Sequence, residues 1–437
     1  MTIARKLFGT DGVRGEAGTF LSAELATALG RATTATLEAE RPQVLIVRDT
    51  RESGPMLEAA LAAGIAAAGG DALLGGVLPT PAAAILVKRL GLDLAAVVSA
   101  SHNPFHDNGI KFFDSRGVKL ADAVEAEIEA KMDEAPAAAH AGHVRELNGG
   151  LEDYLRELEK AFPLDLAGRR VVLDCANGAT YRAAPAIFER LGAEVEALAV
   201  EPDGRNINAG CGSTHIGSLA ERVAASAAEI GFAFDGDGDR VLAVDGNGKV
   251  HDGDELIALS ALGMARRGEL NGGVVVTVMS NFGFHQAMKE AGVEVAVTQV
   301  GDRYVIDEMG RRGWALGGEQ SGHIIASDFV STGDGIAAAL MTMRELGGAR
   351  LEDAAPMKKL PQVLVNVEVA DRTAIEGATA VWDAVEQEEE ALGDRGRVLL
   401  RPSGTEPLVR VMAEAPTPEE AEAVCGRLVD LVRRELG

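Results

Sequence analysis

The sequence has few cysteines, no long apolar run and no excess of positive charge, and each shortage excludes a class of protein. Cys175, Cys211 and Cys425 are widely spaced among 437 residues and form no CxxC pair. They provide neither a cysteine-based zinc site nor a disulfide framework, and they suit a reducing cytoplasm. No segment reaches the roughly 18 apolar residues of a membrane span, and the first residues, MTIARKLFGTDG, lack the apolar core of a signal peptide. We therefore expect a cytoplasmic protein without a membrane partner.

The charge balance is strongly acidic. There are 42 lysines and arginines against 67 aspartates and glutamates, which gives a formal net charge of −25. Proteins that bind nucleic acid normally carry a basic face, so we expect no nucleic-acid partner. If the ligand is itself an anion, basic residues have to gather locally at its site.

The composition, 47% hydrophobic and 25% charged residues, is that of a soluble globular protein, and the length predicts several domains. Apolar strand-like runs alternate with helical patterns, which indicates α/β layers. In the first part we predict strands at 43–49 and 95–100 and a helix at 55–68. Charged helices follow at 125–134 and 151–162, with residues 135–150 as a connector. Alanine-rich stretches such as AALAAGIAAAGG favour helices packed through small residues.

Two further units begin at RRVVLDCANGAT and at HDGDELIALSALGMA, and the first of these contains a hairpin, VLAVDGNGKV, turned at residues 245–248. The last unit is smaller, with the strand-like runs VLVNVEVAD and GRVLLRPSGTEPLVRVMAEA and a final amphipathic helix. We predict three related α/β domains with mixed sheets and a C-terminal α+β domain. The expected boundaries are 1–152, 153–252, 253–361 and 362–437.

The stretch SASHNPFHDNGIK, Ser99 to Lys111, follows the apolar run LAAVV. Asn, Pro, Ser and Gly end strands and build turns, so a plain turn explains the composition. The alternative is that Ser101 is a nucleophile or phosphate carrier at the carboxyl end of a strand, where open α/β sheets place their ligands. The stretch by itself leaves both interpretations open.

A second polar loop, DGDGDR, also follows an apolar strand-like run, GFAF. Asp235, Asp237 and Asp239 alternate with glycines that let the backbone curl, so their oxygens can converge on one hard cation such as Mg²⁺. A solvated Asp-Gly turn is the alternative. A calcium EF-hand is excluded, because its sixth position requires Gly and holds Arg240, and its twelfth requires Glu and holds Gly246.

Three more loops carry polar groups at close spacing: FGTDGVRG with Arg14, GEQSGH at residues 318–323, and RPSGTEP at residues 401–407. GEQSGH offers donors and acceptors for sugar hydroxyls, and RPSGTEP offers an arginine fork and neutral donors for phosphate oxygens. Each alone also fits an ordinary tight loop. Together, a phosphate carrier, a metal triad, a polyol-binding loop and a phosphate-binding loop are what moving a phosphoryl group on a sugar phosphate requires.

These motifs resemble those of the α-D-phosphohexomutase family. SASHNP with Lys111 is similar to the family's phosphoserine loop, DGDGDR to its metal loop, GEQSGH to its sugar loop and RPSGTEP to its phosphate-binding loop. The four occur in the family's order, one per expected domain, over essentially the whole chain. The resemblance implies a heart-shaped, four-domain architecture around a central cleft.

The resemblance also implies roles for individual residues. Ser101 would be the phosphorylated serine, and Mg²⁺, one per subunit, would be held by the Ser101 phosphate with Asp235, Asp237 and Asp239. The residues implied at the transfer site are Lys111, as a candidate proton handler, His102, Arg14 and Arg240. Those implied for the sugar are Glu319 and Ser321, with His323 nearby. Those implied for the substrate's non-reacting phosphate are Arg401, Ser403, Gly404, Thr405 and Arg410.

Within the family, the combination of FGTDGVRG, SASHNP and GEQSGH is most similar to bacterial enzymes that act on glucosamine phosphate. The implied reaction interconverts glucosamine 6-phosphate and glucosamine 1-phosphate through a 1,6-bisphosphate, which is both intermediate and activator, and feeds UDP-N-acetylglucosamine and cell-wall precursor synthesis. The partner is then a small-molecule hexosamine phosphate, and a homodimer stays open. The alternatives are a phosphomannomutase or phosphoglucomutase of the same family, a metal-dependent phosphatase, and a catalytically inactive sugar-phosphate-binding protein.

Overall fold

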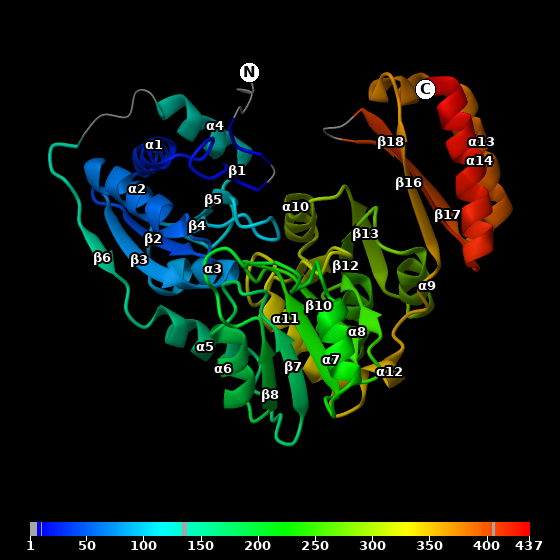
Figure 1. The fold of residues 1–437 in the computed structure, drawn as a ribbon, viewed down its shortest axis with the longest axis horizontal. Helices are drawn as coiled ribbons and strands as arrows, with labels where there is room; N and C mark the ends of the chain where they lie inside the picture. The colour runs from blue at the N-terminus through cyan, green and yellow to red at the C-terminus, as the bar shows by residue number, and fades with distance from the viewer. Residues whose placement is uncertain (1–6, 10, 133–137, 404–406) are drawn as a thin grey trace. The chain divides into compact units, whose positions relative to one another are not determined.

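The computed structural model describes residues 7–9, 11–132, 138–403 and 407–437. Two compact units make up the chain (Figure 1): the first comprises Met1–Met279 and Val293–Ala355, and the second comprises Ser280–Gly292 and Pro356–Gly437. The first unit contains three sheets that mix parallel and antiparallel strands, and the second contains one antiparallel sheet. The predicted fold class, three α/β domains and a smaller C-terminal α+β domain, is confirmed.

The N-terminal sheet has six strands in the order β1-β5-β4-β2-β3-β6. Its strands are β1 (Val13–Glu16), β2 (Gln43–Arg48), β3 (Asp71–Val77), β4 (Leu94–Val98), β5 (Asp107–Asp114) and β6 (Val144–Glu146). Its helices are α1 (Ala23–Thr34), α2 (Gly54–Ala67), α3 (Thr80–Arg89) and α4 (Asp122–Lys131). Strand β4 is parallel to β2, whereas β5 runs antiparallel to both β4 and β1. This reversal places the chain between β4 and β5 in a hairpin loop.

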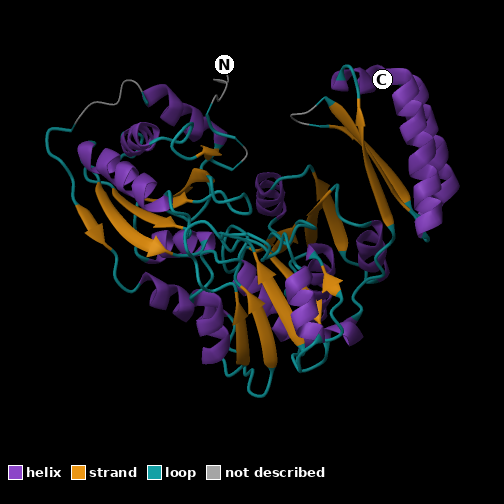
Figure 2. Cartoon of the chain, in the orientation of Figure 1, coloured by secondary structure: helices purple, strands orange, loops and turns teal. Residues whose placement is uncertain are grey.

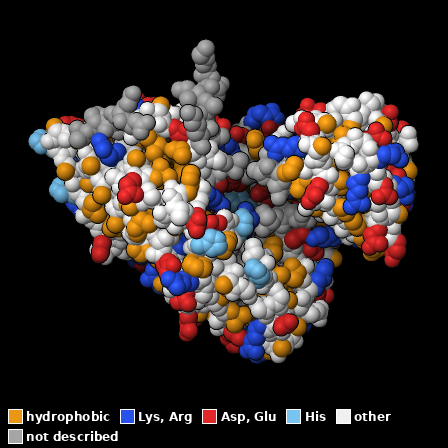
Figure 3. Space-filling model, turned by 45° about the horizontal axis from the view of Figure 1, so that its top comes forward, with side chains coloured by type: hydrophobic (Ala, Val, Ile, Leu, Met, Phe, Trp, Pro, Cys, Tyr) orange, Lys and Arg blue, Asp and Glu red, His pale blue; other side chains and the backbone are white. Residues whose placement is uncertain are grey.

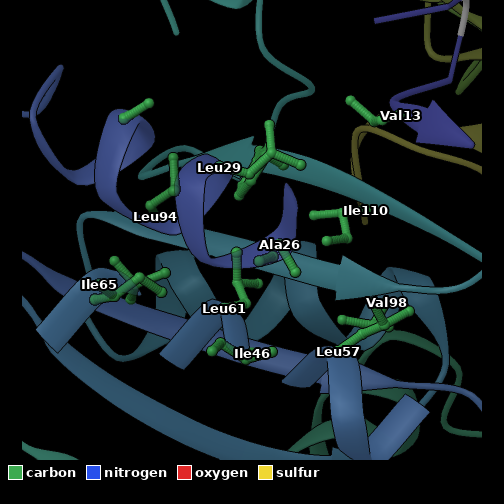
Figure 4. Close-up of a cluster of buried hydrophobic side chains, with 14 of the residues drawn as sticks. Val13, Ala26, Leu29, Ile46, Leu57, Leu61, Ile65, Leu94, Val98 and Ile110 are labelled. Atoms are coloured by element: carbon green, nitrogen blue, oxygen red, sulfur yellow. The ribbon is translucent and has the colours of Figure 1, made fainter. Parts of the chain in front are cut away.

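The core of this domain lies between one face of the sheet and helices α1 and α2. Alternate strand residues such as Ile46 and Val98 point toward Leu29 and Leu61 of the helices (Figure 4), and all four are buried. Helices α1 and α2 approach closely because small residues meet: a Cβ on Gly30 would lie 2.4 Å from the carbonyl oxygen of Leu61. The predicted packing through small residues is confirmed.

The second and third sheets follow the same plan. The second, in the order β11-β10-β9-β7-β8, is built from α5 (Gly150–Ala161), β7 (Arg170–Asp174), α6 (Ala183–Arg190), β8 (Glu194–Leu198), α7 (Gly217–Ala224), β9 (Ile230–Phe234), β10 (Val241–Asp245) and β11 (Val250–His251). The third, in the order β13-β12-β14-β15, is built from α8 (Gly253–Arg267), β12 (Gly273–Thr277), β13 (Glu294–Thr298), α10 (Asp302–Arg312), β14 (Leu316–Gly318), β15 (Ile324–Ala326), α11 (Gly335–Leu346) and α12 (Leu351–Ala354).

The second unit contains a three-stranded antiparallel sheet in the order β16-β18-β17. Its elements are α9 (Phe282–Glu290), β16 (Gln362–Glu368), α13 (Thr379–Leu392), β17 (Arg397–Pro402), β18 (Leu408–Glu414), α14 (Pro418–Leu436) and 3₁₀ turns at Arg372–Gly377 and Gly393–Arg395. The two long helices α13 and α14 lie side by side along one face of the sheet (Figure 2), and a cluster of buried valines and leucines fills the space between.

A shared feature of the four sheets positions the candidate loops. In each sheet one of these loops joins two neighbouring antiparallel strands: β4 to β5, β9 to β10, β14 to β15, and β17 to β18. We name them the Ser101 loop (residues 99–106), the Asp loop (235–240), the Glu319 loop (319–323) and the Arg401 loop (401–407). Each is therefore anchored at both ends by strand pairing.

Most predicted elements are present, with two differences. The helix predicted at 55–68 is α2, and the hairpin turned at residues 245–248 joins β10 to β11. The strand predicted at 95–100 ends at Val98, because Ser99 and Ser101 instead hydrogen-bond to each other and Ser101 adopts a left-handed backbone conformation. The predicted connector contains a short strand, β6, which adds to the sheet edge at β3. The four domain boundaries stay a prediction.

The surface carries side chains of both charges, and the helices are those expected from a sequence without long apolar runs. On the face drawn in Figure 3, acidic and basic side chains are interspersed with apolar ones. None of the helices in the described part of the chain combines the length and apolar character that a bilayer crossing requires.

Candidate active site

Ser101 lies where the Ser101 loop meets the Asp loop. Its side chain is buried, and its Oγ donates a hydrogen bond of 2.5 Å to Oδ2 of Asp235. The backbone of Ser101 has φ of +51°, in the left-handed region that L residues rarely occupy. His102 is half-buried beside it, with Nδ1 3.4 Å from Ser101 Oγ. The structure thus brings together the predicted phosphate carrier and a predicted metal ligand from two different sheets.

The three carboxylates of the Asp loop converge as the sequence predicts. One ligand atom from each of Asp235, Asp237 and Asp239 lies within 4.8 Å of the others, and all three residues are buried. Oδ1 of Asp237 and Oδ1 of Asp239 are buried and accept no hydrogen bond from the residues that the structure describes. Buried carboxylate oxygens without donors are costly unless a cation binds them. The arrangement fits a hard divalent cation such as Mg²⁺.

The pKa values of Asp235 and Asp239 are shifted because both carboxylates are buried close to other charged groups. Burial, followed by the nearby charges of Asp239 and Asp237, raises the pKa of Asp235 well above its usual value. Burial acts in the same direction on Asp239, but His323 and Lys111 hold the pKa of Asp239 well below its usual value. The negative charge of the cluster is thus only partly offset by the protein, and a bound cation would offset the rest.

Lys111 provides a buried positive charge against the metal triad. It lies on β5, and its Nζ is 2.8 Å from Oδ2 of Asp237 and 3.7 Å from Oδ2 of Asp239. Burial alone would lower the pKa of Lys111, but the carboxylates of Asp11 and Asp237 raise it above its usual range. Lys111 is therefore an ammonium group, which suits a charge partner and hydrogen-bond donor to anionic oxygens better than a base.

Two arginines complete the positive charge around the cluster. Arg14 on β1 forms an ion pair with Asp11, and the charges of Asp11 and of the Asp loop raise the pKa of Arg14 against the effect of burial. The backbone N–H of Arg240 donates to Oδ1 of Asp235 at 3.2 Å, and its Nε lies 3.9 Å from Asp239. Burial and then these two arginines lower the pKa of His102, which favours the neutral imidazole.

The Glu319 loop lies against the Asp loop. The backbone N–H of Val241 donates to the carbonyl oxygen of Gly322 at 3.0 Å, and Nδ1 of His323 lies 3.6 Å from Oδ2 of Asp239. The neighbouring carboxylates raise the pKa of His323 against burial. However, Nε2 accepts a 3.0 Å hydrogen bond from the backbone N–H of Gly333, so the geometry assigns the proton to Nδ1.

The two other predicted sugar-binding residues differ in exposure. Glu319 is buried, and its Oε1 accepts a 2.9 Å hydrogen bond from the backbone N–H of Gly301. Ser321 is exposed. The second oxygen of Glu319 and the hydroxyl of Ser321 are thus the groups of this loop that suit contacts to a polyol.

The Arg401 loop lies in the second unit. Arg401 and Arg410 face each other across β17 and β18, and burial together with the charge of Arg410 lowers the pKa of Arg401. Two arginines this close favour a bound anion. Ser403 is buried, and its carbonyl oxygen accepts a 2.9 Å hydrogen bond from Nη1 of Arg372. Gly404 and Thr405 lie outside the described residues.

Comparison with protein families accounts for most of the chain. Four family models, for domains I, II, III and the C-terminal domain of phosphoglucomutase/phosphomannomutase, match residues 5–139, 152–248, 252–360 and 364–431. The chain belongs to this family. The resemblance to phosphohexomutases found in the sequence is confirmed.

Named relatives and solved structures of the family agree with this assignment. Proteins named phosphoglucosamine mutase from Moorella thermoacetica and Nocardioides sp. are 52% and 51% identical to the chain, which covers 98% and 99% of their lengths, with 97% and 99% of this chain aligned. A family protein of known structure from Burkholderia thailandensis is 24% identical, with a TM-score of 0.84 over 99% of this chain and 98% of its own. An N-acetylphosphoglucosamine mutase from Aspergillus fumigatus, solved with GlcNAc-6P and magnesium, is 18% identical, with a TM-score of 0.68 over 99% and 96%.

Several residues of this family site were not singled out in the sequence. Thr80, at the start of α3, donates from Oγ1 to Oδ2 of Asp237 at 2.5 Å. Lys119 forms ion pairs with Asp11 and Asp302, and all three lie beside the predicted residues. Asp11 belongs to FGTDGVRG and was within reach of sequence reasoning. Lys119 and Asp302 are separated by 183 residues, and no local signal connects them.

Proposed function

We propose that this protein interconverts glucosamine 6-phosphate and glucosamine 1-phosphate through a phosphorylated Ser101. The observation that carries the proposal is the hydrogen bond from Ser101 Oγ to Asp235 within the cluster of three buried carboxylates. A serine hydroxyl in that place can carry a phosphoryl group at the position where a cation and fixed positive charges offset its charge. The names of the relatives that match over nearly the whole chain support the amino sugar as substrate.

The proposed reaction has two phosphoryl transfers of opposite direction. First, the bond between phosphorus and Ser101 Oγ breaks, a bond from phosphorus to O1 of glucosamine 6-phosphate forms, and the O1 proton leaves. The product is glucosamine 1,6-bisphosphate, and the serine oxygen takes up a proton. The bisphosphate then turns over. Ser101 Oγ loses its proton and forms a bond to the phosphorus at position 6, the bond from that phosphorus to O6 breaks, and O6 takes up a proton as glucosamine 1-phosphate is released. Each transfer needs in-line placement more than covalent chemistry.

The metal triad has a defined part in this proposal. Asp235, Asp237 and Asp239 would hold Mg²⁺ together with an oxygen of the Ser101 phosphate, and the ion would offset charge on the transferring group. The unpartnered Oδ1 atoms of Asp237 and Asp239 support this assignment.

The positive side chains around the triad act on the same group. Lys111 is proposed as the proton handler of the site: neighbouring carboxylates raise its pKa, so it keeps a proton close to the reacting oxygens and stabilises the negative charge that develops on the serine oxygen when the phosphoryl group departs. Arg14 and Arg240 are proposed to orient the phosphoryl oxygens. His102, with a lowered pKa, is proposed as a neutral neighbour that accepts or donates one hydrogen bond.

The substrate's remaining groups are assigned to two loops. Glu319 and Ser321 are proposed to bind sugar hydroxyls, with His323 supporting the loop through Asp239 and Gly333. The residues proposed for the non-reacting phosphate are Arg401, Ser403, Gly404, Thr405 and Arg410. A sugar that binds in two orientations requires such contacts to serve either phosphate.

The direct test is phosphorylation of Ser101. Intact mass and phosphopeptide mapping of purified protein, after incubation with the 1,6-bisphosphate, are expected to place one phosphate on Ser101. Ser101→Ala should lose activity by more than about 10³-fold while it keeps its unfolding midpoint. Ser218→Ala, at an exposed serine of α7, is the matched control. Phosphate on Ser99, or full activity of Ser101→Ala, would contradict the proposal.

The test of substrate choice is separate. We expect the highest kcat/KM with glucosamine 1-phosphate and slower turnover of glucose 1-phosphate or mannose 1-phosphate. The difference between an amine and a hydroxyl at carbon two corresponds to about 1–3 kcal/mol, or about 10- to 200-fold. An equal or higher kcat/KM with either neutral sugar would reject the amino-sugar assignment and leave the mutase chemistry in place.

A further inference from the structure

Arg51 is a buried arginine that no motif in the sequence singles out. It follows β2, its side chain is 0% exposed, and its Nε donates to Oδ2 of Asp49 at 2.8 Å. A charged side chain is rarely buried this completely without a specific role. The other groups to which it donates belong to the Ser101 loop and to Asp107, the first residue of β5.

Each of the five N–H groups of the Arg51 guanidinium has an acceptor. One acceptor is the Asp49 carboxylate, and the other four are backbone carbonyl oxygens of Ser101 (2.9 Å), Asn103 (2.8 Å), Asp107 (2.9 Å) and Pro104. Four carbonyl dipoles that point at one buried spot require a donor there, because unsatisfied buried acceptors are costly. A planar fork with five donors meets that need, and lysine with three does not.

A second side chain holds the same carbonyls from another domain. Nδ2 of Asn208 donates to the carbonyl oxygens of Ser101 at 2.9 Å and of Asn103 at 3.2 Å. On the near side, Ser99 Oγ accepts the backbone N–H of Ser101 at 3.0 Å and donates to Oδ2 of Asp49 at 2.6 Å. The peptide groups on both sides of Ser101 are thus fixed by side chains that lie outside the reacting cluster.

We propose that Arg51, assisted by Asn208, is a positioning residue for phosphoryl transfer. It holds the Ser101 loop in the conformation in which Ser101, with its left-handed backbone, directs Oγ at the metal triad. A left-handed L residue is unfavourable and persists only where its surroundings over-determine it. Arg51 donates to Asp49 and to backbone carbonyl oxygens, so its hydrogen bonds do not involve the Ser101 hydroxyl or the three carboxylates of the Asp loop. This inference rests on the proposed transfer at Ser101.

The position of Ser101 matters twice in each catalytic cycle. The serine oxygen has to lie in line with the phosphorus when it releases the phosphoryl group and again when it accepts one. A displacement of about 1 Å can cost about 10²-fold in rate. The effect should therefore fall on kcat, whereas the groups that bind the sugar are unchanged and KM should stay the same.

The experiment compares Arg51→Lys with Arg41→Lys. Arg41 precedes β2, and its Nε and Nη2 both donate to Asp71 Oδ1, so it is a matched arginine–aspartate pair at the other end of the same strand. For Arg51→Lys we expect kcat to fall about 10²-fold, with KM for glucosamine 1-phosphate within about threefold. The single-turnover rate of phosphate loss from phospho-Ser101 to glucosamine 6-phosphate should fall by the same factor. Arg41→Lys should leave both rates within about twofold.

A second variant covers the case in which Arg51→Lys does not fold. Asn208→Gly removes the two hydrogen bonds and tolerates the positive φ of 58° at that position. It should lower the single-turnover rate about tenfold and leave KM unchanged. Rates within twofold of wild type, in whichever of the two variants is folded, would overturn the inference. Wild-type protein that never carries phosphate on Ser101 would instead reject the proposed function, so the two failures are distinguishable.

Discussion

The Ser101 loop and the Asp loop meet at one point but are held in place in opposite ways. Two side chains from elsewhere in the chain, those of Arg51 and Asn208, fix the Ser101 loop by donating hydrogen bonds to its carbonyl groups. The Asp loop approaches the Ser101 loop closely because Gly236 has no side chain. A Cβ on Gly236 would lie 2.5 Å from the carbonyl oxygen of Ser101. The conformation of a reactive loop can thus be fixed by hydrogen-bond donors from distant residues or by its own glycines. Substitutions should therefore impair the two loops in different ways: by removing a donor from the first, and by adding a side chain to the second.

Among changes to the Asp loop and its surroundings, the largest effect is expected from the carboxylates that this loop presents. Asp237→Asn keeps the shape of the side chain but removes its charge, so it should weaken metal binding and lower kcat by about 10³-fold, which corresponds to about 4 kcal/mol. Chelation of wild-type protein should abolish activity, and added Mg²⁺ should restore it. Asp307→Asn, at an exposed aspartate of α10, is the control. Full activity in the presence of chelator would contradict the metal role.

The next largest effect is expected when a side chain is added at Gly236. Gly236→Ala places a methyl group against the Ser101 carbonyl and within 2.8 Å of Asn208 Nδ2, so one loop has to shift. We expect kcat to fall about 10²-fold, and the unfolding free energy to fall by about 1–3 kcal/mol. Gly217→Ala on α7, where a Cβ meets nothing within 4 Å, should change neither. An unchanged rate would show that the close approach of the loops is not needed.

A smaller effect is expected from Thr80, which hydrogen-bonds to one carboxylate of the metal triad. Thr80→Val removes the donor to Asp237 Oδ2 while it keeps the side-chain shape. We expect the Mg²⁺ concentration for half-maximal activity to rise about tenfold, with kcat at saturating Mg²⁺ nearly unchanged. Titration of activity with Mg²⁺ measures both quantities, and exposed Thr19→Val is the control. A fall in kcat that added Mg²⁺ does not reverse would assign Thr80 a different role.

The smallest effect concerns a hairpin beyond the Asp loop. His251 lies between Asp245 and Glu255, with ring nitrogens 3.1 Å and 3.0 Å from their carboxylates. Burial opposes protonation, but these two carboxylates raise the pKa of His251 above 6.5. The folded state therefore binds the proton more tightly, and the added stability is complete below pH 6.5 and is lost as pH rises through the raised pKa.

Denaturant unfolding from pH 6 upward measures this loss. We expect the midpoint of wild-type protein to decline over the first units above pH 6.5, and His251→Gln to show a flatter profile. His215→Gln, at an exposed histidine of the same domain, should keep the wild-type slope. Parallel profiles for wild type and His251→Gln would reject a raised pKa.

The comparison of the two loops also explains what the sequence could and could not predict. The convergence of the three Asp-loop carboxylates could be predicted because its constraints, alternating glycines and aspartates, lie within six consecutive residues. The sequence pattern indicates the Ser101 loop but not what fixes its conformation. The residues that fix it are far away in the sequence: Arg51 precedes Ser101 by 50 residues and Asn208 follows it by 107. The α/β alternation gave the fold class, since strand and helix periodicity is local. The edge strand β6 was missed because its three residues carry no apolar alternation.

The reach of Asn208 has a consequence for how the protein is made. During synthesis the Ser101 loop emerges well before the residues around Asn208, which lie 107 positions further along the chain and in the next sheet. Until that second sheet has folded, the Ser101 carbonyl lacks one of its donors and Asp235 is not available to the serine hydroxyl. The capacity of Ser101 to accept phosphate should therefore arise late, after long-range contacts close. In a refolding experiment, phosphate uptake from the 1,6-bisphosphate should follow the slowest folding phase, and uptake in the earliest phase would contradict this order.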